Sequence, residues 1–368
     1  MSQTINSGFT STVSTYVSEL TVDGGGTLRV IAGGTADVTF VSSGGSAAIS
    51  AQGAADNIVI SGGGVVTVSS GGTADVVQVN GELTVGPHAG LTSATVLPHG
   101  AVLVSAGGTA FSDVIDGGSE TVSSGGTDIN ADVLSGTLLV SAGGTAQDTS
   151  ASLPGTAEIA AGGVEQVTAF GSATGVTLLA GGSMTLGSQG VASATVLQSG
   201  ASVTVSAGAT LDGTRIGSGA TAVIGSGGID SGNVIAIGGS ETVLAGGSSV
   251  SAALGNEFVA LAGAVLTVSS GGVASNALVY DGLVAILSGG VAVDPTVSIS
   301  GAIVVSSGGV LSDTNATPVA GVTLEAGGSI VLPIAGVLGG LVVESGATLS
   351  LGAAQGLALG TISGGGLV

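Results

Sequence analysis

Few side chains of this 368-residue sequence could carry out chemistry, and carboxylates are the most numerous of them. The chain has 23 Asp and Glu residues, 2 Lys and Arg residues, 2 His residues and no Cys, giving a net charge of -21. Asp37, Asp56 and Asp75 recur every 19 residues. Like charges stacked closely repel, share protons or bind a cation. The calcium-binding pattern Gly-Gly-x-Gly-x-Asp is missing, however, so we interpret these residues as solvated corner aspartates and predict no metal site.

Basic side chains are too few for the usual chemistry of acidic polysaccharides. Such chemistry needs clustered carboxylates, or calcium with a basic group. The cations Arg29 and Arg215 are far apart in the sequence, and His88 and His99 follow prolines in adjacent corners, where we expect exposed turn residues. We therefore predict no catalytic residue, no cofactor and no enzyme. A polysaccharide-active β-helix enzyme remains an alternative.

Charge and composition also exclude several partners. Binding to nucleic acid or to an anionic membrane surface requires clustered cations, which this chain lacks. The uncharged stretch Ala326–Val343 approaches the length of a membrane span, but it contains Pro333 and keeps the spacing of the repeat described next. We therefore predict no nucleic-acid partner and no membrane insertion of this segment.

A short motif of an aliphatic residue, Ser, a small residue and two glycines recurs along the chain. It reads Val68-Ser69-Ser70-Gly71-Gly72, for example, and most copies lie 18 or 19 residues apart. Four residues before the last glycine, nearly every copy has Val, Ile or Leu. The last glycines of the copies, degenerate ones included, are Gly34, Gly53, Gly72, Gly90, Gly108, Gly126, Gly144, Gly163, Gly190, Gly208, Gly228, Gly247, Gly272, Gly290, Gly309, Gly328 and Gly346.

This repeat predicts an all-β solenoid. Glycine suits sharp corners between short strands, and alternation such as Thr67-Val68-Ser69 gives each strand one apolar face. A unit of about 19 residues cannot bury that face alone, but coils stacked as parallel strands can. With five Phe, two Tyr and no Trp, the core must consist of Val, Ile, Leu and Ala. We predict a single-stranded parallel β-helix of about 17 coils of 18–20 residues.

The spacing also predicts the organisation of the chain. Residues 1–23 do not fit the repeat and are expected to cap the first coil, residues 24–346 to form the solenoid, and residues 347–368 to form a last degenerate coil or to begin a further region. Two longer intervals follow Gly163 and Gly247. We expect the extra residues, near Ala169–Gly175 and Ser249–Phe258, to bulge outward as loops.

The Ser-Ser-Gly-Gly corners, and the Gly-Gly-Thr-Ala-Asp segments at Gly33–Asp37 and Gly71–Asp75, resemble the passenger repeats of AIDA-type, antigen 43-like self-associating autotransporter adhesins. The resemblance spans roughly Asp23 to Gly346. It implies a right-handed β-helix at a bacterial cell surface. It also implies a glycosyltransferase partner that O-heptosylates corner serines, here Ser69, Ser70, Ser123, Ser124, Ser269, Ser270, Ser306 and Ser307.

We therefore predict an extracellular, structural and adhesive protein whose main partner is itself, in lateral or end-to-end association that supports biofilm or surface attachment. Surface glycans or an abiotic surface are further candidate partners. A filament-forming matrix protein is one alternative. An ice-binding solenoid is another, because Thr67, Thr121, Thr242, Thr267 and Thr323 would share one outward column, interrupted at Leu103, Leu139 and Val304.

Overall fold

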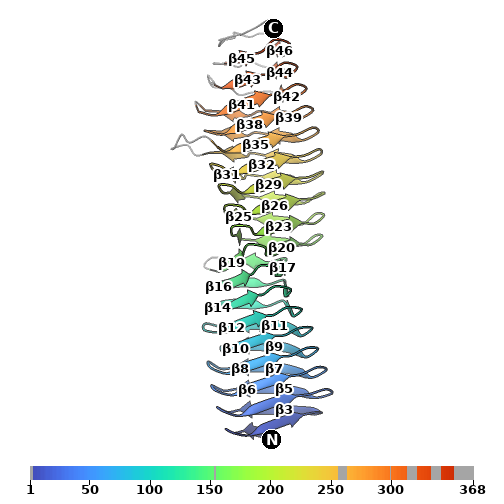
Figure 1. Ribbon diagram of the computed structural model, residues 1–368, viewed down its shortest axis with the longest axis vertical. Helices are drawn as coiled ribbons and strands as arrows, with labels where there is room; N and C mark the ends of the chain where they lie inside the picture. The colour runs from blue at the N-terminus through green and yellow to red at the C-terminus, as the bar shows by residue number, and fades with distance from the viewer. Residues whose placement is uncertain are drawn as a thin grey trace. The chain divides into compact units, whose positions relative to one another are not determined.

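The computed structural model describes residues 3–152, 155–255, 263–298, 300–312, 321–332 and 341–351. Across these residues it has 46 strands and no helix, and all the described strand pairs run parallel. Successive strands form the rungs of a parallel β-solenoid of about 17 turns, as predicted (Figure 1). Within the described part of the chain, there is accordingly no helix with the length and apolarity to cross a membrane.

The strands in the first half of the chain vary in length from two to nine residues. They are β1 (Gln3–Ile5), β2 (Thr10–Val13), β3 (Tyr16–Val22), β4 (Thr27–Val30), β5 (Thr35–Val41), β6 (Ser46–Ile49), β7 (Ala54–Ile60), β8 (Val65–Val68), β9 (Thr73–Val79), β10 (Glu82–Val85), β11 (Gly90–Val96), β12 (Ala101–Val104), β13 (Thr109–Phe111), β14 (Val114–Val122), β15 (Thr127–Ile129), β16 (Asp132–Val140), β17 (Thr145–Gln147), β18 (Ser150–Ala151), β19 (Thr156–Ile159), β20 (Val164–Val167), β21 (Ser172–Thr174) and β22 (Val176–Leu178).

Up to Ser312, the later strands repeat a pattern of four, three and two residues. They are β23 (Ser183–Leu186), β24 (Val191–Ser193), β25 (Val196–Leu197), β26 (Ser202–Val205), β27 (Thr210–Asp212), β28 (Arg215–Ile216), β29 (Thr221–Ile224), β30 (Ile229–Ser231), β31 (Val234–Ile235), β32 (Ser240–Val243), β33 (Ser248–Val250), β34 (Ala253–Leu254), β35 (Val265–Val268), β36 (Val273–Ser275), β37 (Leu278–Val279), β38 (Leu283–Ile286), β39 (Val291–Val293), β40 (Thr296–Val297), β41 (Ala302–Val305), β42 (Val310–Ser312), β43 (Val322–Leu324), β44 (Ser329–Leu332), β45 (Val342–Val343) and β46 (Thr348–Leu351).

The chain divides into two compact units. Unit 1 comprises Met1–Val167, Ser172–Thr177 and Gly181–Ser183, and unit 2 comprises Thr168–Gly171, Leu178–Ala180 and Met184–Val368. In unit 1, residues 3–22 already form β1 to β3, and β1 pairs with β3 in register from Gln3 with Leu20 to Ile5 with Val22. The predicted boundaries after residues 23 and 346 stay predictions, and residues 352–368 lie outside the described part.

The core is aliphatic, as the composition requires. In the strands that precede the corners, exposed or half-buried residues alternate with buried ones, so that Val66 and Val68 point inward while Val65 and Thr67 point outward. Apart from Met184, the buried apolar side chains are all Ala, Val, Leu or Ile. The large rings lie outside: the exposed aromatic residues are Phe9, Tyr16, Phe40, Phe111 and Phe170.

Alanine at a corner accounts for the apparent exceptions to the repeat. The turn at Ser69–Gly72 is closed by the Gly72 N–H, which donates to the Ser69 carbonyl at 2.8 Å. Three copies have alanine at the position of Gly72: Ala89 donates to Gly86, Ala209 to Ser206 and Ala347 to Glu344. The corner therefore lies one residue before Gly90 in the first copy, and one residue after Gly208 and Gly346 in the other two. The buried positions before these corners are Val85, Val205 and Val343.

The predicted outward loop after Gly163 is wrong. Ser172–Thr174 form β21, whose Thr174 pairs with Ser150 of β18 in unit 1. In unit 2, Phe170 N–H donates to Ser188 O and Val191 N–H to Gly171 O, which continues the ladder through the turn. The extra residues thus belong to the coil itself.

The second predicted loop is also wrong over the residues that can be described. Ser249 lies in β33, and Ala253 and Leu254 form β34, which pairs with β31 and β37. Residues 256–258, the rest of this interval, fall outside the described residues.

Candidate functional site

The paired corner serines occupy one repeated turn. In each pair the carbonyl of the first serine accepts the N–H of the second glycine at 2.8 Å. The first glycine has φ of 74 to 77°, which a type II turn requires at its third position and which glycine adopts without a penalty. These turns begin at Ser69, Ser123, Ser269 and Ser306.

The two serines of a pair differ in exposure. Ser69, Ser123, Ser269 and Ser306 are half-buried, whereas Ser70, Ser124, Ser270 and Ser307 are exposed. The second hydroxyl of each pair is therefore the one that a large reagent reaches first.

The stacked aspartates form the expected column. Asp37 pairs with Asp56, and Asp56 with Asp75. The next residue in the column is Thr92, because of the register change at Ala89, and not Ser93 as the glycine count suggests. Each of the last two carboxylates accepts the N–H of the following residue, Asn57 at 2.8 Å and Val76 at 2.9 Å.

Asp37 accepts hydrogen bonds from two side chains. Asn57 Nδ2 donates to its Oδ1 at 3.0 Å and Tyr16 Oη donates to its Oδ2 at 2.9 Å. These bonds favour the ionised form, so the Asn57 amide and then the Tyr16 hydroxyl lower the pKa of Asp37, while the same carboxylate raises the pKa of Tyr16. Hydrogen bonds within the corner thus satisfy this carboxylate.

The basic side chains are dispersed. Arg29 is exposed on β4 of unit 1, and Arg215 is exposed on β28 of unit 2. His88 and His99 are both exposed at corners, with φ of 55 and 74°. The peptide of His88 lies in a row with Gly71 and Gly107, whereas Pro98, next to His99, lies against Gly117. The two imidazoles therefore belong to different rows of corners.

The outward threonines do not form a continuous row. The column in unit 1 runs through Thr67, Thr84, Leu103, Thr121 and Leu139. The column in unit 2 runs through Thr204, Val223, Thr242, Thr267, Ala285, Val304 and Thr323. Aliphatic residues interrupt both.

Sequence reasoning missed a group of carboxylates in the interior of unit 1. Asp113, Glu120 and Asp128, which we call the acidic core cluster, each have no exposed surface. One carboxylate oxygen from each lies within 4.8 Å of the others, and among the described residues this is the one group of three or more such side chains close enough to share a metal ion. We therefore compare each acid with the residues at the same position in the coils before and after it.

In each column the neighbours are aliphatic. Glu120 stands between Val102 and Leu138, and Asp128 stands between Ala110 and Ala146. A carboxylate two residues before the buried Val122 breaks the inward pattern of its strand, which is the signal that the sequence offered. Burial raises the pKa of Asp113, Glu120 and Asp128, and the mutual proximity of the negative charges raises those of Glu120 and Asp128 further.

Unit 2 has a related but different interior group. Asp230, Asn233 and Glu241 are fully buried, and Asn233 Nδ2 donates a hydrogen bond to Glu241 Oε2. Their columns place Asp230 between Leu211 and Ser249, and Glu241 between Ala222 and Leu266. Burial raises the pKa of both acids, that of Glu241 to about 7. This group therefore consists of two acids and an amide, whereas the acidic core cluster consists of three acids.

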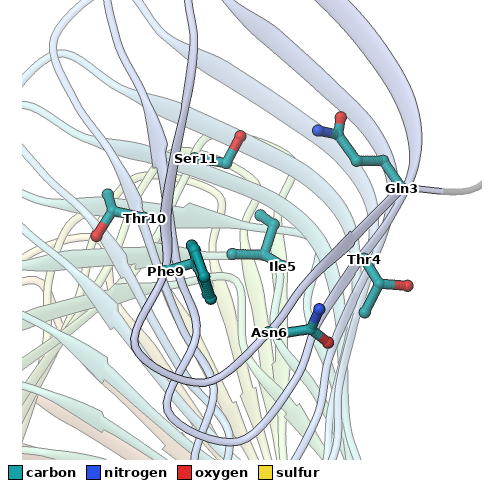
Figure 2. Close-up of a pocket in the computed structure, with 7 residues that line it drawn as sticks. All are labelled: Gln3, Thr4, Ile5, Asn6, Phe9, Thr10 and Ser11. Carbon is teal, nitrogen blue, oxygen red and sulfur yellow. The ribbon is translucent and has the colours of Figure 1, made fainter.

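A pocket of about 300 Å³ lies beside the first coil. Its lining consists of Gln3, Thr4, Ile5, Asn6, Phe9, Thr10 and Ser11, whose side chains Figure 2 shows. None of these side chains is an acid, a base or a strong nucleophile, so the pocket offers hydroxyl, amide and aromatic contacts.

Comparison with known proteins gives only distant structural likenesses. No protein family profile matches the chain, and no curated protein matches it. Among solved structures it is similar to the TibC-catalysed hyper-glycosylated TibA fragment, with 23% identity over 95% of this chain and 97% of that one and a TM-score of 0.32.

Two further similar structures are enzymes. One is a mannuronic acid-specific polysaccharide family 6 lyase from human gut microbiota, with 9% identity, 92% and 82% coverage of this chain and that one, and a TM-score of 0.20. The other is the A-module of the Azotobacter vinelandii mannuronan C-5 epimerase AlgE4, with 12% identity, 90% coverage of each chain and a TM-score of 0.20. Our prediction that the chain is no enzyme is therefore corrected, because structures similar to it include enzymes.

Proposed function

We propose that this chain is a structural, adhesive β-solenoid of a bacterial surface that associates with copies of itself through repeated lateral contacts. The observation that carries the proposal is an outward column in unit 2 that, from Val191 to Val273, alternates exposed aliphatic residues with hydroxyl residues. It runs through Val191, Thr210, Ile229, Ser248 and Val273 in register.

Such a column suits weak, repeated association. Val191, Ile229 and Val273 are 41%, 41% and 37% exposed, although β-branched side chains of this kind are usually buried. Covering them against an identical face removes apolar surface from water, and the hydroxyls between them can bond across the contact. Because each coil adds one more outward side chain to the column, the strength of association grows with the aligned length.

The net charge of -21 opposes this contact at neutral pH. Protonation of surface carboxylates toward about pH 4 should therefore promote association. We expect beads that carry the chain to aggregate more as the pH falls from 7 to 4, which light scattering measures. An unchanged particle size over this range would contradict lateral self-association.

A triple variant tests the column itself. Val191→Glu, Ile229→Glu and Val273→Glu place charges on every second coil of the face, and we expect at least about a tenfold loss of bead aggregation. The matched control, Ser70→Glu, Ser270→Glu and Ser307→Glu, adds the same charge at exposed corners. Equal loss in both variants would assign the effect to net charge and count against the column.

Glycosylation of the corners belongs to the same proposal and rests on the sequence resemblance together with the exposure of the hydroxyls. If a bacterial heptosyltransferase is co-expressed, we expect sugars on Ser70, Ser124, Ser270 and Ser307 before the half-buried partners Ser69, Ser123, Ser269 and Ser306. Peptide mass spectrometry would map the modified residues. Preferential modification of the half-buried serines would contradict this order.

A further inference from the structure

The interior of unit 1 contains more unpartnered carboxylate oxygens than a buried core tolerates without a cation or protons. Asp113 Oδ2, both Glu120 oxygens and both Asp128 oxygens are buried and have no hydrogen-bond partner. Asp113 Oδ1 accepts the Ala94 N–H at 2.7 Å. Buried polar atoms are nearly always paired, so five orphaned oxygens in one place need a cation or protons to satisfy them.

The three side chains come from one coil. Asp113 precedes β14, Glu120 lies within β14 and Asp128 lies in β15, so they span residues 113–128. The positions beside Glu120 and Asp128 in the flanking coils hold Val102, Leu138, Ala110 and Ala146. Aliphatic residues fit these positions, and the one other acid of unit 1 in the column of Asp128 is the buried Glu165, which follows Ala146 two coils further on.

From these contacts we infer that the acidic core cluster is a binding site for a divalent cation, with Ca²⁺ as its preferred occupant. Since one oxygen of each side chain lies within 4.8 Å of the other two, some point lies within about 2.8 Å of all three. Small side-chain adjustments bring such distances to the 2.3–2.6 Å typical of Ca²⁺. Five free oxygens approach the six to eight that Ca²⁺ accepts.

The chemistry of the donors selects among ions. All the ligand atoms are carboxylate oxygens, which favour hard cations over zinc or copper. Mg²⁺ normally keeps several waters, whereas this cluster has no exposed surface, and Ca²⁺ tolerates irregular coordination. The site contains no protein cation: Arg29 and Arg215, the two Lys and Arg residues of the sequence, are exposed elsewhere.

The test uses the full chain, unfolded in guanidinium with EDTA and refolded with or without 1 mM CaCl2, because a buried site fills as its coil closes. We expect Ca²⁺ to raise Tm by about 5 °C or more. Metal analysis after gel filtration should find one Ca²⁺ per chain, and MgCl2 should give a smaller shift. A Tm that is the same with and without Ca²⁺, or a larger shift with Mg²⁺, would overturn the inference.

Variants separate this site from the acidic surface. Glu120→Gln and Asp128→Ala should both fold, because they remove buried charge and Ala already occupies the flanking positions of Asp128. Each should lose the bound Ca²⁺ and the Tm shift. The matched control Glu241→Gln removes a buried acid from unit 2 and should keep both. A shift that persists undiminished in Glu120→Gln and Asp128→Ala would place Ca²⁺ elsewhere and refute the site.

Discussion

Val104→Asp should destabilise the protein by about 4 kcal/mol, which lowers Tm by roughly 10 °C. Val104 is fully buried in β12, stacked between Val85 and Val122. The new carboxyl group would have no partner there, and it must either stay charged in an apolar environment or take up a proton at a cost in free energy. Differential scanning calorimetry at pH 7 measures the change.

The matched control is the preceding residue. Leu103 is 39% exposed on the opposite face of the same strand, so Leu103→Asp should change the free energy of unfolding by less than about 1 kcal/mol. The two variants should differ because successive side chains of a strand point to opposite faces, and only one face of β12 is buried. Similar losses in the two variants would mean that β12 does not present one face to a dry core.

The second large effect concerns Asp230 and Glu241 in unit 2. We expect the protein to be more stable at pH 5 than at pH 8, which is opposite to ordinary acid denaturation. Burial raises the pKa of Glu241 to about 7, and burial, Glu241 and the nearby Asp212 raise the pKa of Asp230. In the unfolded chain, a glutamate titrates near pH 4.3.

The sign follows from proton uptake. Between about pH 4.5 and 7 the folded protein keeps a proton that the unfolded chain has released, so the free energy of unfolding falls as the pH rises. At about 1.4 kcal/mol per pH unit and per proton, Glu241 alone contributes on the order of 3 kcal/mol, and the raised pKa values of Asp113 and Glu165, both about 7, act in the same direction. Tm at pH 5 should then exceed Tm at pH 8 by about 5–10 °C, measured in EDTA so that protons alone vary.

Glu241→Gln isolates the pair. The amide can still accept the hydrogen bond from Asn233 and donate one to Asp230, so the variant should be more stable than the natural chain at pH 8 and less dependent on pH. Glu82→Gln, at an exposed strand position, controls for the change in net charge. A natural chain that is most stable at pH 8 would contradict the assignment of a buried, protonated pair.

The fold could be predicted from the sequence because the residues that repeat at a regular interval are also the residues that point into the core. Val68, Val104, Val122 and Val140 recur at intervals of 18 or 36 residues, and all are fully buried. The one-residue errors of register came from treating glycine as the only marker of a corner. Ala89 and Ala209 can occupy the corner too, and they move the register by one residue.

The interior site was missed because acids were read as solvent-facing. Asp37 does face solvent at a corner, but Asp128 lies one position earlier in its strand, opposite Ala110 and Ala146. In a solenoid, one residue decides between the core and the surface. The inward register of Val122 would have placed Glu120 in the core from the sequence alone, whereas the meeting of three acids in one cross-section needed the structure.

Parallel stacking in register is the claim on which the rest depends, and distances between spin labels test it most directly. The chain has no Cys, so Arg29→Cys can be paired in turn with Leu103→Cys, Thr121→Cys and Leu139→Cys, all outward positions of one column in unit 1. They lie four, five and six coils from Arg29, so pulsed electron spin resonance should give about 19, 24 and 29 Å, in equal steps of about 4.8 Å. Distances that fail to increase along this series would contradict the solenoid.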